Sequence, residues 1–208
     1  MIKLCLGSTL ILLIAAMPVI ADDSAYNAVR NNIFWSELYD EDYVGLYCGR
    51  AFAGDHKITI EHVYPADWMA KANGCDNRNS CPKDAYRQAS SDLHNLWPAE
   101  RRYNSSRSNK QFGVIPGNDP RFTDESPACD FERTSGADAV VEPRDSVKGE
   151  IARSMLYMIW KYQLPDHGQF QLMMEWNFRD PPNDAEKIRY IDARALQGRL
   201  NPYIEMWM

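Results

Sequence analysis

The chain has 208 residues, of which 45% are hydrophobic and 12% aromatic, and its formal net charge at pH 7 is −6. This composition suffices for one well-packed domain, and the sequence contains neither an internal repeat nor a long low-complexity linker. The acidic balance argues against a protein whose whole surface attracts a polyanion, so a nucleic-acid partner would have to bind in a local basic groove.

Residues 1–21 have the pattern of a secretory signal peptide. A single cation, Lys3, precedes a short apolar run, and small residues stand near the end of the segment. The run is shorter than the roughly 20 residues that a membrane-spanning helix needs, and Pro18 ends it. We therefore expect cleavage after Ala21, a single mature domain at residues 22–208, and an exported protein without a membrane anchor.

Hydrophobic periodicity and turn-forming residues predict the elements of the mature chain. The C-terminal third is the most regular, with apolar residues recurring as one buried helix face after Pro143, and with Gly198 after the last helix. In chain order, the predicted elements are a helix at 26–39, strands at 43–47 and 57–63, loops at 73–84 and 115–127, and helices at 147–162, 170–178 and 185–196. The predicted fold class is α+β, a small antiparallel sheet with surrounding helices.

Four cysteines remain after removal of the leader: Cys48, Cys75, Cys81 and Cys129. An even number in an exported chain favours disulfides, and three pairings are possible. We expect Cys75–Cys81 as a local staple, because these two are close enough to clip one polar segment, and Cys48–Cys129 as a long-range bridge. The alternative is a Cys-ligated zinc, although the sequence lacks the two tight Cys-x-x-Cys pairs typical of such sites.

Three polar clusters contain residue types that could carry chemistry. They are Glu61-His62 at the end of a predicted strand, Asp92-Leu93-His94-Asn95, and the basic run from Arg101 to Lys110 around Asn104. Each also has a structural explanation, since a histidine in an apolar strand is often a hydrogen-bonded core residue and a basic run is often a solvated helix face. Their coexistence in one chain favours a catalytic site.

Cleavage of a phosphodiester needs an activated water, a cation for the developing charge, and donors that hold the phosphate. A neutral His62 could accept the water proton, because the pKa of an unperturbed histidine is about 6.5. Glu61 and an asparagine amide offer the oxygen ligands that Mg²⁺ prefers. On a regular strand Glu61 and His62 point to opposite faces, which would put the metal and the base on opposite sides of phosphorus. Cleavage should decline as the pH falls through the pKa of His62.

Longer stretches of the sequence resemble a known family. These are Ile60-Glu61-His62-Val63-Tyr64-Pro65-Ala66, Ser91-Asp92-Leu93-His94-Asn95-Leu96-Trp97-Pro98-Ala99, and Asn104 followed by Arg107-Ser108-Asn109. The chain resembles the bacterial endonuclease I family over nearly its whole mature length. The resemblance implies a periplasmic or secreted non-specific nuclease of the ββα-metal, or His-Me finger, type that cuts DNA and RNA and leaves 5′-phosphate ends.

The resemblance also implies roles for individual residues. His62 would be the general base, and Glu61 and Asn104 would be the two protein ligands of a single Mg²⁺, in a site that Mn²⁺ or Ca²⁺ could also occupy. Arg78 resembles the arginine that steadies the cleaved phosphate, although the family usually has a Gly-Gly-Arg context where this chain has Asp76-Asn77-Arg78. Arg107, three residues after Asn104, is the alternative for that role.

Further polar residues are expected around this site. His94 and Asn95 would lie beside the strand that ends at His62 and would support its ring by a hydrogen bond. The substrate backbone would be bound by three basic residues: Arg102, Arg107 and Lys110.

Two other functions fit the same residues. A secreted metallo-phosphoesterase acting on small or lipid phosphates would use the same base and ligands, and a catalytically inactive relative that only binds nucleic acid would fit the acidic charge. We expect a monomer that acts on DNA and RNA without discriminating sequence, because phosphate contacts position a nuclease without identifying bases.

Overall fold

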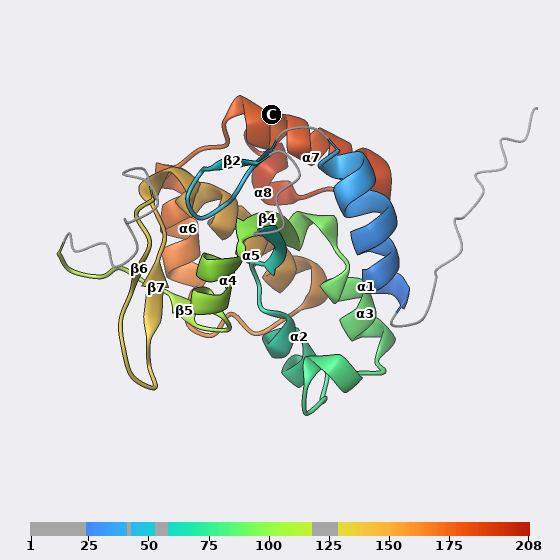
Figure 1. The fold of residues 1–208 in the computed structure, drawn as a ribbon, viewed down its shortest axis with the longest axis horizontal. Coiled ribbons are helices and arrows are strands. Elements are labelled where there is room, and N and C mark those ends of the chain that lie inside the picture. Colours follow the sequence, from blue (N-terminus) through green and yellow to red (C-terminus); the bar gives the residue numbers. More distant parts are fainter. Residues whose placement is uncertain (1–23, 41–42, 53–57, 118–128) are drawn as a thin grey trace, which may run out of the picture.

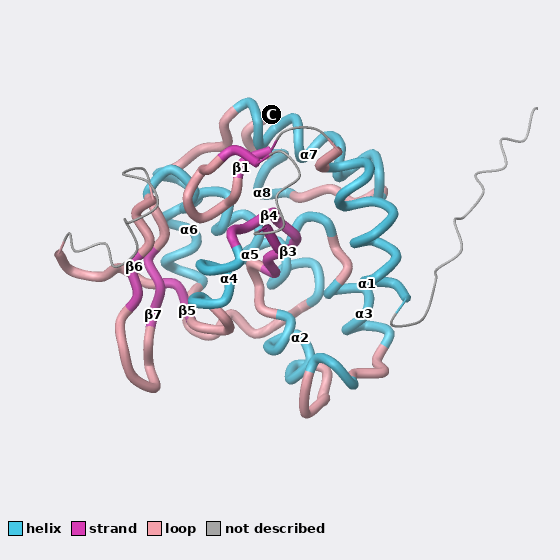
Figure 2. Tube along the Cα trace, in the orientation of Figure 1, coloured by secondary structure: helices cyan, strands magenta, loops and turns pink. Residues whose placement is uncertain are grey.

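The computed structural model describes residues 24–40, 43–52, 58–117 and 129–208 (Figure 1). The expected signal peptide at 1–21 and residues 118–127 of the expected loop lie outside this part of the chain. Helices surround short strands (Figure 2), which confirms the α+β fold class.

The first described element is the helix that the sequence predicts at 26–39. It begins as α1 (Ser24–Val29) and continues as η1 (Arg30–Leu38), where the helix widens to π-type hydrogen bonding. Tyr39 N–H accordingly donates to the carbonyl of Phe34, five residues earlier, at 3.0 Å. Phe34 is fully buried in a small apolar cluster with Leu93 and Leu96, which docks this helix on the rest of the molecule.

A strand, strand, helix unit forms the centre of the fold. β3 (Ile58–His62) pairs antiparallel with β4 (Leu96–Glu100), with His62 opposite Leu96, and α4 (Arg101–Arg107) follows β4 directly. β4 contains Pro98, which cannot donate a ladder hydrogen bond. Among the described residues, however, this sheet has two strands, and the Pro98 carbonyl accepts from Leu46 N–H at 2.8 Å.

The segment between β3 and β4 contains four short helices. α2 (Ala66–Ala72) and α3 (Asp84–Ser90) flank the predicted loop at 73–84, within which η2 (Arg78–Ser80) is a single 3-10 turn. A further 3-10 turn, η3 (Leu93–Asn95), leads into β4. The sequence patterns did not predict α2 or α3, because each is only 7 residues long and shows little periodicity.

The remaining strands correct the prediction of a single antiparallel sheet. β1 (Tyr43–Val44) pairs with β2 (Ala51–Phe52), and β7 (Val140–Glu142) lies between β5 (Gln111–Phe112) and β6 (Glu132–Arg133). Over the described ranges the strands therefore form three small sheets, and the β5–β7 pair is parallel. These strands have two or three residues, too few for alternation to reveal their partners.

The C-terminal helices agree closely with the predictions. η4 (Asp145–Val147) leads into α5 (Lys148–Tyr162), and α6 (Phe170–Arg179), α7 (Asp184–Gln197) and α8 (Pro202–Glu205) follow. Their ends carry recognisable signals: the Asn183 side chain accepts from Glu186 N–H at the start of α7, and Gly198 adopts a left-handed conformation at its end.

α5 is more deeply buried than its single predicted apolar face implies. Every residue from Gly149 to Met158 is buried, polar ones included. Arg153 is accommodated by an ion pair with Glu186 of α7, and Ser154 by the indole N–H of Trp97, which donates at 2.9 Å. α5 is thus the central helix of the domain, and it carries polar anchors as well as core packing.

Both expected disulfides are present. Cys48 is bonded to Cys129 across a sequence separation of 81 residues, and Cys75 to Cys81 across six. All four thiols are thereby used, so the zinc alternative is wrong. In the described part of the chain, no helix combines the length and the apolar character that crossing a membrane requires.

Candidate active site

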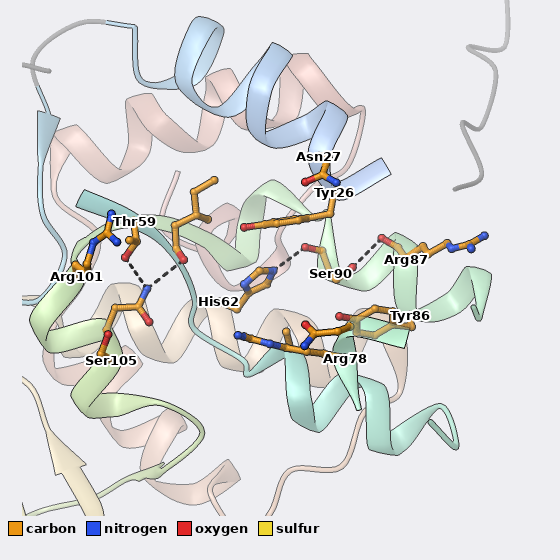
Figure 3. Close-up of a pocket in the computed structure, with 14 residues that line it drawn as sticks. Tyr26, Asn27, Thr59, His62, Arg78, Tyr86, Arg87, Ser90, Arg101 and Ser105 are labelled. Atoms are coloured by element: carbon orange, nitrogen blue, oxygen red, sulfur yellow. Dashed lines mark hydrogen bonds between the residues drawn. The ribbon is translucent and has the colours of Figure 1, made fainter. Parts of the chain in front are cut away.

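The end of β3 opens onto two adjoining cavities. The wide cavity has a volume of about 610 Å³ and extends toward Tyr26 (Figure 3), and the narrow cavity has a volume of about 410 Å³ and extends toward Glu61. The two share His62, Arg78 and Asn104 in their walls. Residues from β3, from η2 and from α4 are therefore brought together around one open space.

His62 is the last residue of β3, and its ring is held by the main chain. Its Nε2 lies 2.8 Å from the carbonyl oxygen of Ser90, at the end of α3 (Figure 3). A carbonyl oxygen only accepts, so Nε2 must carry the proton, and in the neutral imidazole Nδ1 then has the lone pair. The half-buried ring lines both cavities with this tautomer already selected.

The surroundings of His62 keep it neutral. Burial lowers its pKa to about 4, and the positive charges of Arg78 and Arg107 act in the same direction, while the hydrogen bond to Ser90 opposes them. At pH 7 the imidazole therefore has its lone pair available, which is the state a general base requires.

Glu61 is nearly enclosed, with 2% of its surface exposed. Its Oε1 accepts from the Tyr47 hydroxyl at 2.7 Å and lies 3.4 Å from Nη1 of Arg107. Burial raises the pKa of Glu61 to about 7, although Arg107, Tyr47 and Arg78 each lower it. Both contacts fall on Oε1, so Oε2 is the oxygen that can serve a further ligand at the narrow cavity.

Asn104 is oriented by two hydrogen bonds from its amide nitrogen. Nδ2 donates to the Thr59 hydroxyl at 3.0 Å and to the Ile60 carbonyl at 3.1 Å. Because the Ile60 carbonyl can only accept, the nitrogen is identified chemically, and Oδ1 is left for another partner. The side chain lines both cavities, so a carboxamide oxygen from α4 and a carboxylate oxygen from β3 face the same space.

This donor set fits a hard divalent cation. Carboxylate and carboxamide oxygens are the ligands Mg²⁺ and Ca²⁺ prefer, and Mg²⁺ is commonly held by one or two protein ligands with water completing the shell. Groups of three or more His, Cys, Asp or Glu side chains that could hold a metal do not occur among the described residues. Glu61 and Asn104 would therefore hold a cation together with water.

Arg107 explains how neighbours on one strand reach the same cavity. Beyond His62 the chain bends, and the Arg107 guanidinium donates to the carbonyls of His62 at 3.2 Å and Val63 at 2.6 Å. With Glu61 as a further partner and the Phe112 ring 4.5 Å from its Cζ, Arg107 is completely buried. This burial contradicts the expectation that Arg107 binds substrate phosphates directly.

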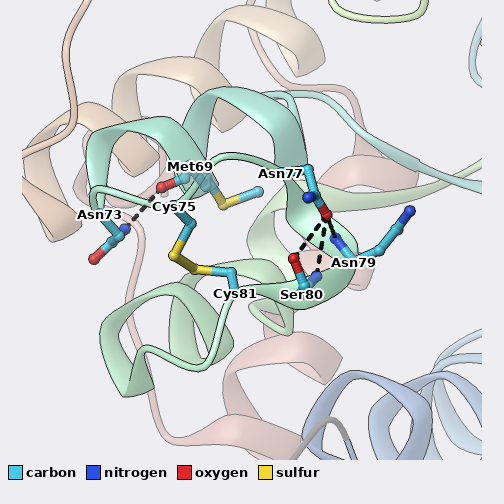
Figure 4. Close-up of a disulfide and its surroundings, with 7 residues drawn as sticks. All are labelled: Met69, Asn73, Cys75, Asn77, Asn79, Ser80 and Cys81. Atoms are coloured by element: carbon cyan, nitrogen blue, oxygen red, sulfur yellow. Dashed lines mark hydrogen bonds between the residues drawn. A yellow bond between two sulfur atoms is a disulfide. The ribbon is translucent and has the colours of Figure 1, made fainter.

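Arg78 stands at the cavity on a stapled loop. The Cys75–Cys81 disulfide closes the loop, and the Asn77 side chain accepts from the main-chain N–H groups of Asn79 and Ser80 at 3.0 and 3.2 Å (Figure 4). The exposed Arg78 side chain extends beneath the His62 ring (Figure 3), and its charge lowers the pKa of both Glu61 and His62. Of the two arginines considered for the phosphate, Arg78 has the access.

The two other expected backbone-binding residues lie outside the cavity walls. Neither Arg102, exposed on α4, nor the half-buried Lys110 belongs to the lining of either cavity. Arg101, which belongs to the basic run but was not predicted to bind the substrate, lines the wide cavity instead. A usable signal was its position three residues before Asn104, which places both on one face of α4.

The expected supports of His62 are only partly where they were predicted. Asn95 does lie beside the strand: its Oδ1 accepts from Tyr64 N–H at 2.6 Å, and its Nδ2 donates to the Tyr64 carbonyl at 3.0 Å. His94 faces the other way, with its Nε2 2.8 Å from the Arg199 carbonyl. The residue that holds the His62 ring is Ser90, through its main chain, which leaves no side-chain signature in the sequence.

Comparison with known proteins decides the family. The family model described as Endonuclease I matches residues 17–206. The chain belongs to the endonuclease I family. The family's nucleases are generally metal-dependent, and this chain is a nuclease, a phosphodiester hydrolase.

Three relatives illustrate the family's range. An "Extracellular deoxyribonuclease" of Aeromonas hydrophila is 29% identical, with 99% of this chain and 96% of the relative covered. A "Periplasmic deoxyribonuclease" of the same organism is 32% identical over 72% of this chain and 63% of its own length. An "Extracellular ribonuclease" of Bacillus subtilis (strain 168) is 31% identical over 55% of this chain and 43% of its own length. These names support a periplasmic or secreted location for this endonuclease I family member.

Proposed function

We propose that the chain is an exported, non-specific endonuclease that hydrolyses DNA and RNA with one Mg²⁺ and His62 as general base, leaving 5′-phosphate ends. The observation that carries this proposal is the Nε2 hydrogen bond of His62 to Ser90, which leaves Nδ1 as the acceptor at a cavity also lined by Glu61 and Asn104. The similarity to deoxyribonucleases and a ribonuclease supports both classes of substrate.

The unit of β3, β4 and α4 would serve as the ββα-metal, or His-Me finger, motif. The first strand supplies Glu61 and His62, and the helix supplies Asn104. Glu61 Oε2 and Asn104 Oδ1 would hold the cation, and Mn²⁺ or Ca²⁺ could occupy the same oxygens. When bound, Mg²⁺ neutralises charge that develops on the phosphate and the leaving oxygen.

His62 would act on the attacking water. Its Nδ1 would accept a proton as the water oxygen attacks phosphorus, while the bond from phosphorus to the 3′ oxygen breaks and that oxygen takes a proton from solvent. The resulting imidazolium would keep its Nε2–H bond to the Ser90 carbonyl. Arg107 acts at a distance from the substrate: by holding the His62 and Val63 carbonyls and pairing with Glu61, it keeps base and ligand aimed at one space.

Basic residues would hold the nucleic-acid backbone. Arg78 would donate to the phosphate being cleaved, and Arg101 to the same strand within the wide cavity. Arg102 and Lys110 lie outside the cavities and would bind phosphates farther along the same nucleic-acid strand. Such contacts read no bases, which supports non-specific cutting by a monomer whose site is built from one chain.

Plasmid nicking tests the proposal. We expect the mature protein to nick supercoiled plasmid and to degrade RNA with Mg²⁺, to stop when EDTA is added, and to leave ends that accept a 5′ label only after phosphatase treatment. Release of phosphate from small esters without nicking would instead favour a phosphoesterase. Retention of DNA without cutting, with or without metal, would favour an inactive binding protein. Size-exclusion chromatography with light scattering tests the monomer.

A further inference from the structure

Tyr26 lies directly against the proposed base. It belongs to α1, and its ring centroid is 5.1 Å from that of His62, with the two planes tilted by 39°. Figure 3 shows the His62 ring between Tyr26 on one side and Arg78 on the other. Val29 and Ile33, farther along the same helical segment, pack with Tyr26 against the Phe34 cluster, so the position of the Tyr26 ring is set by core packing.

The Tyr26 hydroxyl differs from the other tyrosine hydroxyls near the site. Those of Tyr47 and Tyr64 are satisfied within the protein, by Glu61 at 2.7 Å and by the Pro165 carbonyl at 2.8 Å. For Tyr26, the described part of the chain provides no hydrogen-bond partner, and its side chain lines the wide cavity. A phenol with a strong donor is therefore packed on the base and exposed to the substrate space.

The electrostatic surroundings suit an anion at this hydroxyl. Burial raises the pKa of Tyr26, so its hydroxyl keeps its proton at neutral pH and can donate. The positive charges of Arg30 and Arg78 reach the same group, and they act on it more strongly than the negative charge of Glu61 does. A neutral O–H donor facing the same cavity as a guanidinium is an arrangement that binds phosphate oxygens.

We propose that Tyr26 is a substrate-positioning residue whose hydroxyl donates a hydrogen bond to a non-bridging phosphate oxygen of the strand bound in the wide cavity. This inference rests on the proposed nuclease function and extends it to α1, which contributes none of the base, metal-ligand or arginine residues. Tyr26 and Arg78 would hold the backbone from two sides of His62, so that the phosphate is presented to Nδ1.

Tyr26→Phe tests the inference without disturbing packing, because it keeps the ring and removes only the hydroxyl. The matched control is Tyr203→Phe, since the Tyr203 hydroxyl also has no partner among the described residues but lies outside both cavities. Binding of a short DNA duplex is measured by fluorescence anisotropy with EDTA present, so that cleavage does not interfere. We expect the Kd to rise about tenfold in Tyr26→Phe, as loss of a hydrogen bond to a charged group implies, and to stay unchanged in the control.

Steady-state cleavage separates this role from a purely structural one. Loss of a contact that is made equally before and during the reaction raises KM and leaves kcat unchanged, so we expect KM to rise about tenfold in Tyr26→Phe. A fall in kcat with an unchanged Kd would mean that the hydroxyl serves ring orientation, and would overturn the inference. So would equality of Tyr26→Phe and Tyr203→Phe in both measurements. If the wild-type protein fails to nick plasmid, the nuclease proposal itself fails. If the wild-type protein nicks plasmid but Tyr26→Phe cuts equally well, only the inference about Tyr26 fails.

Discussion

His62 and His94 occupy two regions that look alike in the sequence and differ in the structure. Each histidine stands in a polar cluster beside a strand, and each places Nε2 at 2.8 Å from a main-chain carbonyl, that of Ser90 or that of Arg199. His62 opens onto both cavities, with Arg78 beside it. His94 is only 1% exposed and has the Tyr157 and Tyr190 rings against it.

The comparison shows what separates the proposed base from a core histidine. Burial lowers the pKa of both rings, and both have one nitrogen occupied. The two rings differ at the second nitrogen: Nδ1 of His94 is buried without a hydrogen-bond partner in the described part of the chain, whereas the ring of His62 lines an open cavity. Neighbouring Asp92 accepts from Tyr157, Tyr162 and Arg199, so the His94 region is a polar anchor between helices.

The largest expected effect on activity comes from a substitution of His62, the histidine that faces the cavities. His62→Ala removes the proton acceptor and should lower the plasmid-cleavage rate about 10²- to 10⁴-fold, the usual contribution of general-base catalysis. The melting temperature should stay near that of the wild type, because the half-buried ring contributes modestly to packing. Wild-type cleavage by this variant would falsify the assignment of His62 as base.

Arg78→Ala sharpens the comparison, because Arg78 is exposed at the cavity beside His62, whereas the two arginines near His94, Arg189 and Arg199, donate to oxygens of the protein. Loss of a donor that is proposed to face the reacting phosphate should reduce kcat about 10²-fold. Arg87→Ala is a useful control, since Figure 3 shows its side chain extending away from His62. Equal losses in both variants would point to general charge attraction instead of a specific contact.

His94→Ala tests whether His94 contributes to stability and not to catalysis. Removing a fully buried ring and its bond to the Arg199 carbonyl should lower the free energy of unfolding by about 2 to 4 kcal/mol in urea denaturation. Below the unfolding transition, kcat of the folded protein should remain within a few-fold of the wild type. A loss of kcat as large as that of His62→Ala in folded protein would contradict the division between the two regions.

The pH profile gives the smallest effect. The pKa of His62 is lowered to about 4, so its basic form is present above that pH and is lost as the pH falls through it. At saturating Mg²⁺, kcat should therefore stay flat from pH 8 to 5 and fall toward pH 4, instead of falling near 6.5 as an unperturbed histidine would require. A decline centred near pH 6.5 would show that burial does not shift this ring.

Metal affinity should respond to pH in a different range. The pKa of Glu61 is raised to about 7, so the anionic form that is proposed to bind the metal dominates above that pH and is protonated below it. The Mg²⁺ concentration for half-maximal rate should rise as the pH falls from 7, by at most about tenfold per unit. Titrations of Mg²⁺ at several pH values separate the pH dependence of metal affinity, which reports on Glu61, from the pH dependence of kcat, which reports on His62.

Much of the architecture was predictable where the signal is local. Helix α7 is one example, because Asn183 caps its start and Gly198 ends it. The Cys75–Cys81 staple is another, because its two cysteines are only six residues apart. β4 was not predicted, because Pro98 disfavours strands and its tolerance depends on a two-stranded sheet. In the site, Glu61, His62, Arg78 and Asn104 were found through short motifs, while Tyr26 and Ser90 gave no sequence signal.

The sequence by itself determined the long helices, the local Cys75–Cys81 staple and the candidate base and ligands, since periodicity, turn residues and short motifs depend on near neighbours. Only the tertiary structure decided which polar residues meet solvent. It buried Arg107 against the main chain that follows His62, turned His94 toward Arg199, and placed Tyr26 on the His62 ring. These outcomes depend on contacts between segments far apart in the chain, where burial, and not residue type, sets pKa, access and role.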